Sequence, residues 1–391
     1  MTNDVKNVPE WRFAGFVDEW EKKLLNEIAN VQMGQSPNSK NYTDDSQEMI
    51  LVQGNADLKN GKVFPRIFTK EITKLANIGD ILLSVRAPVG EIGISQMPVC
   101  IGRGVCSITS NLFIYYFLDY FNNENKWKKF SQGSTFESIS GNEVRSLIIY
   151  LPSKTEQQKI GDFFSKLDRQ IELEEQKLAK LEEQKKGYMQ QIFSQQLRFK
   201  DENGNEYPEW EEKKLGDILE RGNKDKVNEI GKYRRLTISL HGKGLYEVKQ
   251  ERKTKDTRPF YQRFEGELII GKQNFFNGSI AIVTKEFNGF ICSNAIMSYK
   301  ISNHMNRKYL LEYLLQNDFL RKNEYLADGT GQKELSEKKF EELEIKLPNS
   351  INEQQKIGVF LERLDNLIEK QSNKLELLKQ RKKSFLQKMF V

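Results

Sequence analysis

Two long stretches of the chain carry apolar residues at alternating spacings of four and three. The first runs from Ile160 to Ile192 and the second from Ile357 to Met389. Such a heptad pattern is typical of a helix that packs along another helix. We therefore predict that the two stretches pair, with these residues at the contact: Phe164, Leu167, Ile171, Leu178 and Leu181 in the first, and Leu361, Leu364, Ile368, Leu375 and Leu378 in the second.

A Leu-Pro pair precedes each stretch and is expected to end the strand before it. The helices should then begin near residues 155 and 352, where capping boxes are found, and end near Phe193 and Phe390. About 38 residues at about 1.5 Å each give a helix of about 57 Å, which is longer than one small domain needs. The boxes are Thr155 with Gln158, and Asn352 with Gln355.

Polar residues interrupt the two heptad patterns at matching positions. Glu174 matches Gln371, and Lys185 matches Lys382. In an antiparallel pair we expect Glu174 to lie toward Lys382 and Lys185 toward Gln371. Antiparallel pairing also predicts a pseudo-twofold relation between the two halves of the chain.

The chain is one unit written twice. The segment Glu156-Gln157-Gln158-Lys159-Ile160-Gly161 recurs 197 residues later, at residues 353–358. The same offset relates the two sequences to the end of the second helix. Arg12-Phe13 near the start resembles Arg198-Phe199 after the first helix, so the repeat is cyclic and we expect the two termini to lie close together.

Between the helices the sequence predicts two α+β domains of short strands, Gly-rich turns and one amphipathic helix each, at residues 111–130 and 306–327. The proposed division is domain 1 at 1–153, a spacer helix at 154–196, domain 2 at 197–349 and a second spacer helix at 350–391. Expected strands are 49–53, 81–85, 92–95, 268–270 and 280–284.

The composition fits an intracellular protein that binds a polyanion. There are 61 basic and 55 acidic residues, a formal charge of +6, and clustered Lys and Arg favour phosphate contacts through counterion release. Three cysteines and no apolar leader or spanning segment predict reduced thiols and a cytoplasmic location.

Polar loops next to predicted strands are the best candidates for DNA contacts, because amide and guanidinium groups bind base edges and phosphates. Arg86 and the run Lys272-Gln273-Asn274 directly follow strands, where a scaffold can hold them. The full set of candidates is Gln35, Ser36, Asn55, Arg86, Arg103, Ser134 and Thr135 in domain 1, and Lys243, Lys272, Gln273, Asn274, Asn277 and Thr330 in domain 2.

No catalytic or metal site is visible in the sequence. Residues 266–272 have the spacing of a phosphate-binding loop, but Gln273 replaces the required Ser or Thr and the segment has the pattern of a strand. Only His241 and His304 are available, and neither has a partner at ligand spacing.

The repeated Leu-Pro and Glu-Gln-Gln-Lys-Ile before each long helix resemble the specificity subunits of type I restriction-modification systems. Residues 34–37, 79–90 and 133–135 are similar to motifs of that family's target-recognition domains, although domain 2 departs from the first two. The resemblance implies two target-recognition domains held apart by antiparallel coiled-coil helices.

The same resemblance implies a non-catalytic subunit that reads a split site in double-stranded DNA. It would bind two methyltransferase subunits and, in the full complex, restriction and translocase subunits. S-adenosylmethionine, ATP and magnesium would belong to those partners, and a helix of about 57 Å corresponds to roughly 17 base pairs. Two other functions fit the pattern, a stand-alone two-domain DNA-binding protein and a coiled-coil scaffold without a DNA role.

Overall fold

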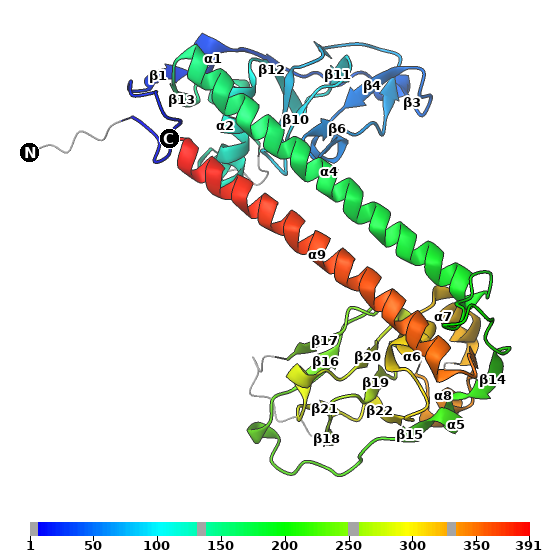
Figure 1. Ribbon diagram of the computed structural model, residues 1–391. Helices are drawn as coiled ribbons and strands as arrows, with labels where there is room; N and C mark the ends of the chain where they lie inside the picture. The colour runs from blue at the N-terminus through cyan, green and yellow to red at the C-terminus, as the bar shows by residue number, and fades with distance from the viewer. Residues whose placement is uncertain (1–6, 131–137, 249–257, 327–333) are drawn as a thin grey trace, which may run out of the picture. The chain divides into compact units, whose positions relative to one another are not determined.

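Two compact units make up the chain. The computed structural model describes residues 7–130, 138–248, 258–326 and 334–391 (Figure 1). Unit 1 contains Met1–Lys177 and Gln371–Val391, and unit 2 contains Leu178–Lys370. The long helix α4 (Lys154–Phe193) begins in unit 1 and ends in unit 2, whereas α9 (Ile351–Met389) begins in unit 2 and ends in unit 1.

A six-stranded sheet, in the order β2-β12-β9-β10-β6-β5, forms the centre of unit 1. It is joined by a five-stranded sheet, β3-β7-β4-β11-β8, and by the antiparallel pair β1-β13. The strands are β1 Glu21–Leu24, β2 Asn30–Met33, β3 Tyr42–Thr43, β4 Met49–Val52, β5 Leu58–Lys59, β6 Lys62–Val63, β7 Phe68–Thr69, β8 Leu75–Ala76, β9 Ile81–Ser84, β10 Ile92–Ile94, β11 Val99–Ile101, β12 Val105–Thr109 and β13 Ile148–Leu151.

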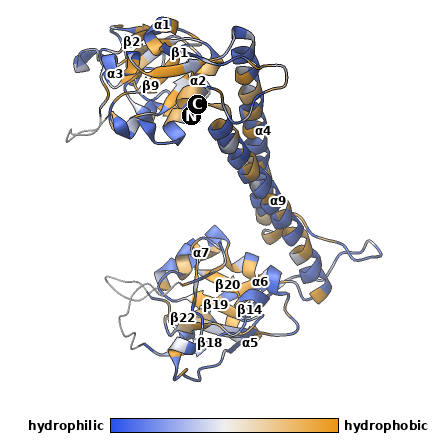
Figure 2. Ribbon diagram, turned by 90° about the vertical axis from the view of Figure 1, so that its left-hand side faces the viewer, coloured by the Kyte–Doolittle hydropathy of each residue, from blue (hydrophilic) through white to orange (hydrophobic). Residues whose placement is uncertain are grey.

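Both faces of the central strand β9 are buried, as its continuous apolar run predicts. Ile81 and Leu83 face a core that includes helix α2 (Leu112–Asn123), while Leu82 faces a smaller core between the sheets. The short helices α1 (Leu25–Ile28) and α3 (Gly141–Arg145) complete the unit. Figure 2 shows the apolar residues gathered on α2 and the strands, while polar residues dominate the long helices.

Unit 2 repeats this arrangement with a four-stranded sheet in the order β15-β22-β19-β20. In its central strand β19, Leu268 and Ile270 face one core and Ile269 faces another. The strands are β14 Glu211–Lys214, β15 Leu219–Arg221, β16 Leu236–Ile238, β17 Leu245–Glu247, β18 Phe260–Gln262, β19 Leu268–Gly271, β20 Ile280–Ile282, β21 Ile291–Ser293, β22 Ile296–Ile301 and β23 Glu344–Leu347; the helices are α5 Leu215–Ile218, α6 Arg307–Leu314, α7 Asn317–Asn323 and α8 Glu337–Glu341.

Within each unit the two long helices run antiparallel. In unit 1 Lys379 pairs with Glu175 at 2.6 Å, and in unit 2 the rings of Tyr188 and Phe360 lie 5.2 Å apart. Phe164 and Leu361 are completely buried, and Leu375 and Leu378 are 8% exposed. The other residues predicted at the helix contact, all half-buried, are Leu167, Ile171, Leu178, Leu181, Leu364 and Ile368.

The predicted pairing of the polar heptad residues is wrong. Glu174 accepts a hydrogen bond from Gln371, its own repeat equivalent, at 2.6 Å and pairs with Lys374. Lys382 and Lys185 bind carboxylates that come partly from the globular domains. The heptad pattern defines which face of a helix is buried but not how far one helix is displaced along the other, so the axial register could not be read from it.

Two other expectations are corrected at helix boundaries. The predicted helix 111–130 ends at Asn123 and is followed by a left-handed Asn125 and a 3-10 turn at Lys126–Lys129, while 306–327 divides into α6, α7 and a 3-10 turn at Glu324–Leu326. Helix α4 begins one residue before Thr155, and the hydroxyl of Ser153 accepts the N–H of Glu156 as the cap. Both Leu-Pro pairs do end strands, β13 and β23.

Candidate nucleic-acid interface

The repeated Glu-Gln-Gln-Lys-Ile-Gly segment fastens each globular domain to a long helix by the same contacts. Glu156, with 1% of its side chain exposed, binds Arg12 through two hydrogen bonds of 2.8 and 2.6 Å. Glu353, fully buried in unit 2, binds Arg198 at 3.1 Å. The pKa of Arg12 is raised, mainly by its hydrogen bond to Glu156. The predicted equivalence of Arg12 and Arg198 is therefore confirmed.

The glycine that closes this segment allows a close approach between helices. A Cβ on Gly161 would lie 2.8 Å from Cβ of Leu112, at the start of α2, and a Cβ on Gly358 would meet Asn306 at the start of α6. The preceding Ile160 and Ile357 are 2% and 1% exposed. The motif is therefore a packing device that holds each domain against its helix.

A lysine from the partner helix completes each fastening. In unit 1, Lys382 binds Asp119 of α2 and Asp168 of α4, each at 2.8 Å. Burial alone would lower the pKa of Lys382, but the two carboxylates outweigh it and raise the pKa. In unit 2, Lys185 binds Glu312 at 3.1 Å and Asp365 at 2.6 Å.

The N-terminal segment lies against the end of α9. The amide of Trp11 donates to the carbonyl of Lys388 at 2.9 Å, and the Lys388 ammonium pairs with Glu10 at 2.9 Å. This contact agrees with the expectation that the two ends of the chain are near each other.

A cleft of about 710 Å³ opens in unit 1 beside the end of β9. Arg86 and Arg103 line it, together with Ser140 and Glu143 at the start of α3. The amide of Ile139 donates to the carbonyl of Val85 at 2.9 Å, which fixes the segment before α3 next to Arg86. Both arginines are exposed and, among the described residues, neither has an ion-pair partner.

A second hollow of about 510 Å³ shares Arg103 and places Gln35 and Ser36 beside it. The Ser36 hydroxyl accepts the backbone N–H of Arg103 at 3.1 Å. The loops pack so closely that a Cβ on Gly104 would meet the carbonyl of Gln53. The loop that contains Gln53 continues to the half-buried Asn55. The structure thus brings the predicted residues Gln35, Ser36, Arg86 and Arg103 together.

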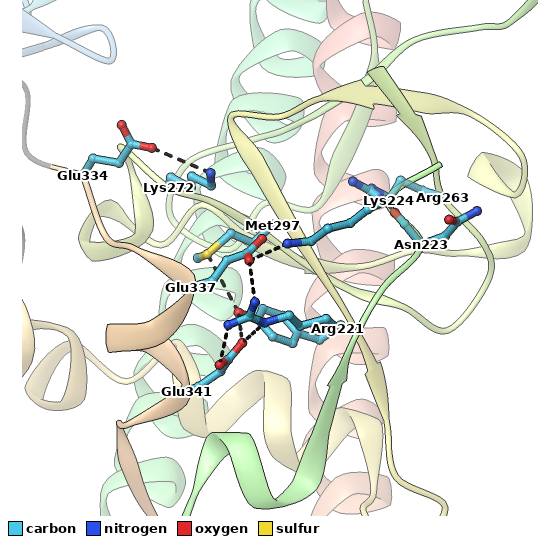
Figure 3. Close-up of polar contacts among 10 residues, drawn as sticks. Arg221, Asn223, Lys224, Arg263, Lys272, Met297, Glu334, Glu337 and Glu341 are labelled. Atoms are coloured by element: carbon cyan, nitrogen blue, oxygen red, sulfur yellow. Dashed lines mark hydrogen bonds and ion pairs between the residues drawn. The ribbon is translucent and has the colours of Figure 1, made fainter. Parts of the chain in front are cut away.

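Unit 2 has an equivalent cleft of about 790 Å³ at the corresponding place in the fold. Here the amide of Leu335 donates to the carbonyl of Lys272 at 3.0 Å, matching the contact of Ile139 with Val85. Lys272 lines the cleft with Arg221, Lys224 and the buried Arg263 (Figure 3). The predicted Lys272 therefore belongs to a cationic group at the end of β19.

Two neighbouring turns carry the other candidates of unit 2. The amide of His241 donates to the carbonyl of Asn277 at 2.8 Å, and Gly242 binds Gly278 in the same way. The exposed residues Lys243, Gln273, Asn274 and Asn277 lie on these two turns or next to them. Ser134, Thr135 and Thr330 lie outside the described residues.

Sequence reasoning missed Arg263. Its side chain is almost entirely buried, and its guanidinium donates to the Asn223 carbonyl at 3.0 Å and the Cys292 sulfur at 3.1 Å. The match of Gly79 with Gly266 places the buried Ala76 at the equivalent position of unit 1. The alignment of the two repeats, which pairs an arginine in one with an alanine in the other, was a usable signal. It is inconspicuous in a chain rich in basic residues.

The segment with phosphate-loop spacing is confirmed as strand, since Leu268–Gly271 is β19. All three cysteines are buried and free. Across the described ranges, no group of three or more His, Cys, Asp or Glu side chains is arranged to hold a metal ion. Helices in those ranges also lack the length and apolar character needed to cross a bilayer.

Two matched α+β domains fastened to paired long helices define the class of protein to which the chain belongs. Residues 17–183 and 207–380 match the family described as type I restriction modification DNA specificity domain. The chain is therefore a member of this family.

Relatives and solved structures agree with that assignment. The type I restriction enzyme MjaX specificity subunit of Methanocaldococcus jannaschii is 32% identical over 191 residues, 47% of this chain and 44% of the relative. The MjaIX specificity subunit of the same organism is 28% identical over 226 residues, 51% of this chain and 52% of the relative. The chain thus spans about half the length of these relatives in the matched region.

The fold resembles that of solved S subunits. The S subunit of the type I restriction-modification system from M. genitalium aligns with a TM-score of 0.64 and 16% identity, covering 98% of this chain and 99% of that one. A chain from a structure on the assembly and conformational transition of the type I R-M system aligns with a TM-score of 0.52 and 16% identity, covering 97% and 99%.

Proposed function

We propose that the chain is the DNA-specificity subunit of a type I restriction-modification complex and that each unit reads one half of a split DNA site. The observation that carries this proposal is the pair of equivalent clefts at the ends of β9 and β19. Each is lined by guanidinium or ammonium groups held on a rigid sheet, which suits phosphate and base-edge contacts.

The proposal places all chemistry on partner subunits. Two methyltransferase subunits would dock on α4 and α9, and restriction and translocase subunits would join the full complex. Exposed leucines along these helices, at Leu173, Leu367 and Leu377, offer apolar contacts for docking. S-adenosylmethionine, ATP and magnesium would be bound by the partners, and the methylated base would be adenine.

Co-expression with the neighbouring methyltransferase gene, in a host free of adenine methylation, tests this directly. We expect the two proteins to copurify and the methylated adenines to define a split motif with a fixed spacer. DNA binding without copurification would favour a stand-alone DNA-binding protein, and copurification without DNA binding would favour a coiled-coil scaffold.

The helices are proposed to set the spacer. Insertion of one heptad into α4 together with one into α9 adds about 10 Å to each at about 1.5 Å per residue, or about three base pairs. The mapped motif should keep both half-sites and gain a longer spacer. An unchanged spacer would refute the role of the helices as a ruler.

A further inference from the structure

The cationic groups of the unit 2 cleft are held by carboxylates whose equivalent positions in unit 1 are not acidic. Glu337, the first residue of α8, accepts from the Lys224 ammonium at 2.6 Å and lies 3.5 Å from the Arg221 guanidinium. Glu341, one turn later, binds Arg221 with hydrogen bonds of 2.6 and 2.9 Å. Figure 3 shows Arg221 and Lys224 both pointing at Glu337, with Lys272 turned to Glu334.

The two repeats carry different residues at the positions of these carboxylates. The capping serines Ser140 and Ser336 are equivalent, so Gly141 occupies the place of Glu337 and Arg145 the place of Glu341. The nearby Glu143 of unit 1 is engaged in its own cap, where it accepts the N–H of Ser140 at 2.7 Å. Among the residues that the structure describes, Arg86 and Arg103 at the unit 1 cleft therefore have no ion pair like those of Glu337 and Glu341.

Glu337 and Glu341 differ in the groups that they contact. Glu341 also accepts from the hydroxyl of Tyr299 at 3.2 Å, and its pKa is lowered mainly by Arg221, so it ties α8 to the sheet. Glu337 bridges two cations, each about half exposed and each within reach of a ligand entering the cleft. A carboxylate between Arg and Lys has the charge and hydrogen-bonding pattern of a phosphate in the same place.

We propose that the unit 2 cleft binds a DNA phosphodiester through Arg221 and Lys224, and that Glu337 occupies that position in the free protein and must be displaced. This rests on the proposed DNA-reading function and adds to it.

The fixed cation Arg263, buried beneath the cleft, supports an anion there. Random DNA would gain little from unit 2, because its phosphate only replaces a carboxylate, whereas the correct half-site supplies additional contacts that favour the exchange. Glu337 is thus a specificity-determining residue.

The test compares Glu337→Gln with Glu342→Gln in the full chain. Glu342 directly follows α8, is exposed and lines a different hollow, so each variant removes one negative charge. Fluorescence anisotropy with a duplex of random sequence, measured over a range of salt concentrations, gives the affinity and its salt slope.

We expect Glu337→Gln to bind random DNA about three- to fivefold more tightly than wild type, with a slope steeper by about 0.9, the value for one more phosphate contact. Glu342→Gln should stay within about 1.5-fold. Adding Lys224→Gln to Glu337→Gln should cancel the gain. Inorganic phosphate at constant ionic strength should compete no better than chloride, whereas unlabelled duplex should compete fully.

Equal affinities for Glu337→Gln and Glu342→Gln would overturn the inference while leaving DNA reading intact. Absence of salt-dependent DNA binding by the wild-type chain, alone and with its methyltransferase, would overturn both. If Glu337→Gln does not fold, Lys224→Gln in the wild-type background serves instead. It should weaken binding to the cognate duplex more than to random DNA, and equal weakening of both would contradict the proposal.

Discussion

Replacing Lys382 by methionine should loosen unit 1 far more than the equivalent change, Lys185→Met, loosens unit 2. Lys382 is 19% exposed and holds Asp119 and Asp168, which are 17% and 35% exposed. Without it the two carboxylates lose the cation that they share, and the ion pairs among the described residues include no second cation for either of them. Breaking a buried pair costs about 3–5 kcal/mol, and partial exposure reduces this to about 2–3 kcal/mol.

The repeat provides the matched control. In unit 2 the ammonium of Lys308 also binds Glu312, at 2.6 Å, and Asp365. A second cation therefore remains after Lys185→Met, and we expect a loss of only about 1 kcal/mol. The pKa of Lys308 is raised because these carboxylates outweigh the effect of burial, so it stays charged at neutral pH.

Hydrogen exchange measured by mass spectrometry separates the two effects. A loss of 2–3 kcal/mol should accelerate amide exchange in α2 by about 30- to 150-fold in Lys382→Met, whereas α6 should accelerate about fivefold in Lys185→Met. Equal acceleration in both variants, or unchanged protection of α2, would refute the assignment of the fastening to this lysine.

Three further outcomes follow from contacts described above. Gly161→Ala should destabilise unit 1 by about 1–3 kcal/mol in thermal unfolding, while Gly187→Ala, whose Cβ would meet nothing within 4 Å, should stabilise by about 0.5–1 kcal/mol; the opposite order would contradict the close-packing argument. Hydrogen bonds from Gln371 and Lys374 lower the pKa of Glu174 from 4.5 to about 2, so its stabilising contribution is present above pH 4.5 and is lost as the pH falls toward 2. An acid titration followed by circular dichroism should show a shallower loss for Glu174→Gln, and an identical curve would count against the contact. Arg103→Ala should weaken binding to a duplex with an intact unit 1 half-site by about 1–3 kcal/mol and leave the other half-site unaffected; a uniform loss on all sequences would mark a phosphate contact instead.

The sequence predicted the long helices and the two-domain α+β fold well because both depend on local, repeated signals. The Leu-Pro pairs, the heptads and the shared Glu-Gln-Gln-Lys-Ile-Gly segment act within one or two helical turns. The break after α2 was missed because Asn125 adopts a left-handed conformation with φ of 53° without a glycine to announce it.

Charge partners were the least predictable part of the structure. Lys382 binds Asp119 of α2, and Lys185 binds Glu312 of α6. In each pair the lysine and the carboxylate are more than a hundred residues apart in the sequence. The cleft of unit 2 could not be anticipated for a similar reason. Its cations come from β15, the loop after it, the end of β18 and the end of β19, and only the sheet topology brings these segments together.

The burial of all three thiols makes the native chain a convenient background for site-directed labelling. Desolvation raises the pKa of Cys106 to about 12 and also raises that of Cys292, so little reactive thiolate exists at neutral pH. A single cysteine introduced on each unit would then take a maleimide fluorophore with little competition. Energy transfer between two such dyes would follow both units as the protein binds duplexes with different spacers. The buried native cysteines would contribute little dye to this signal.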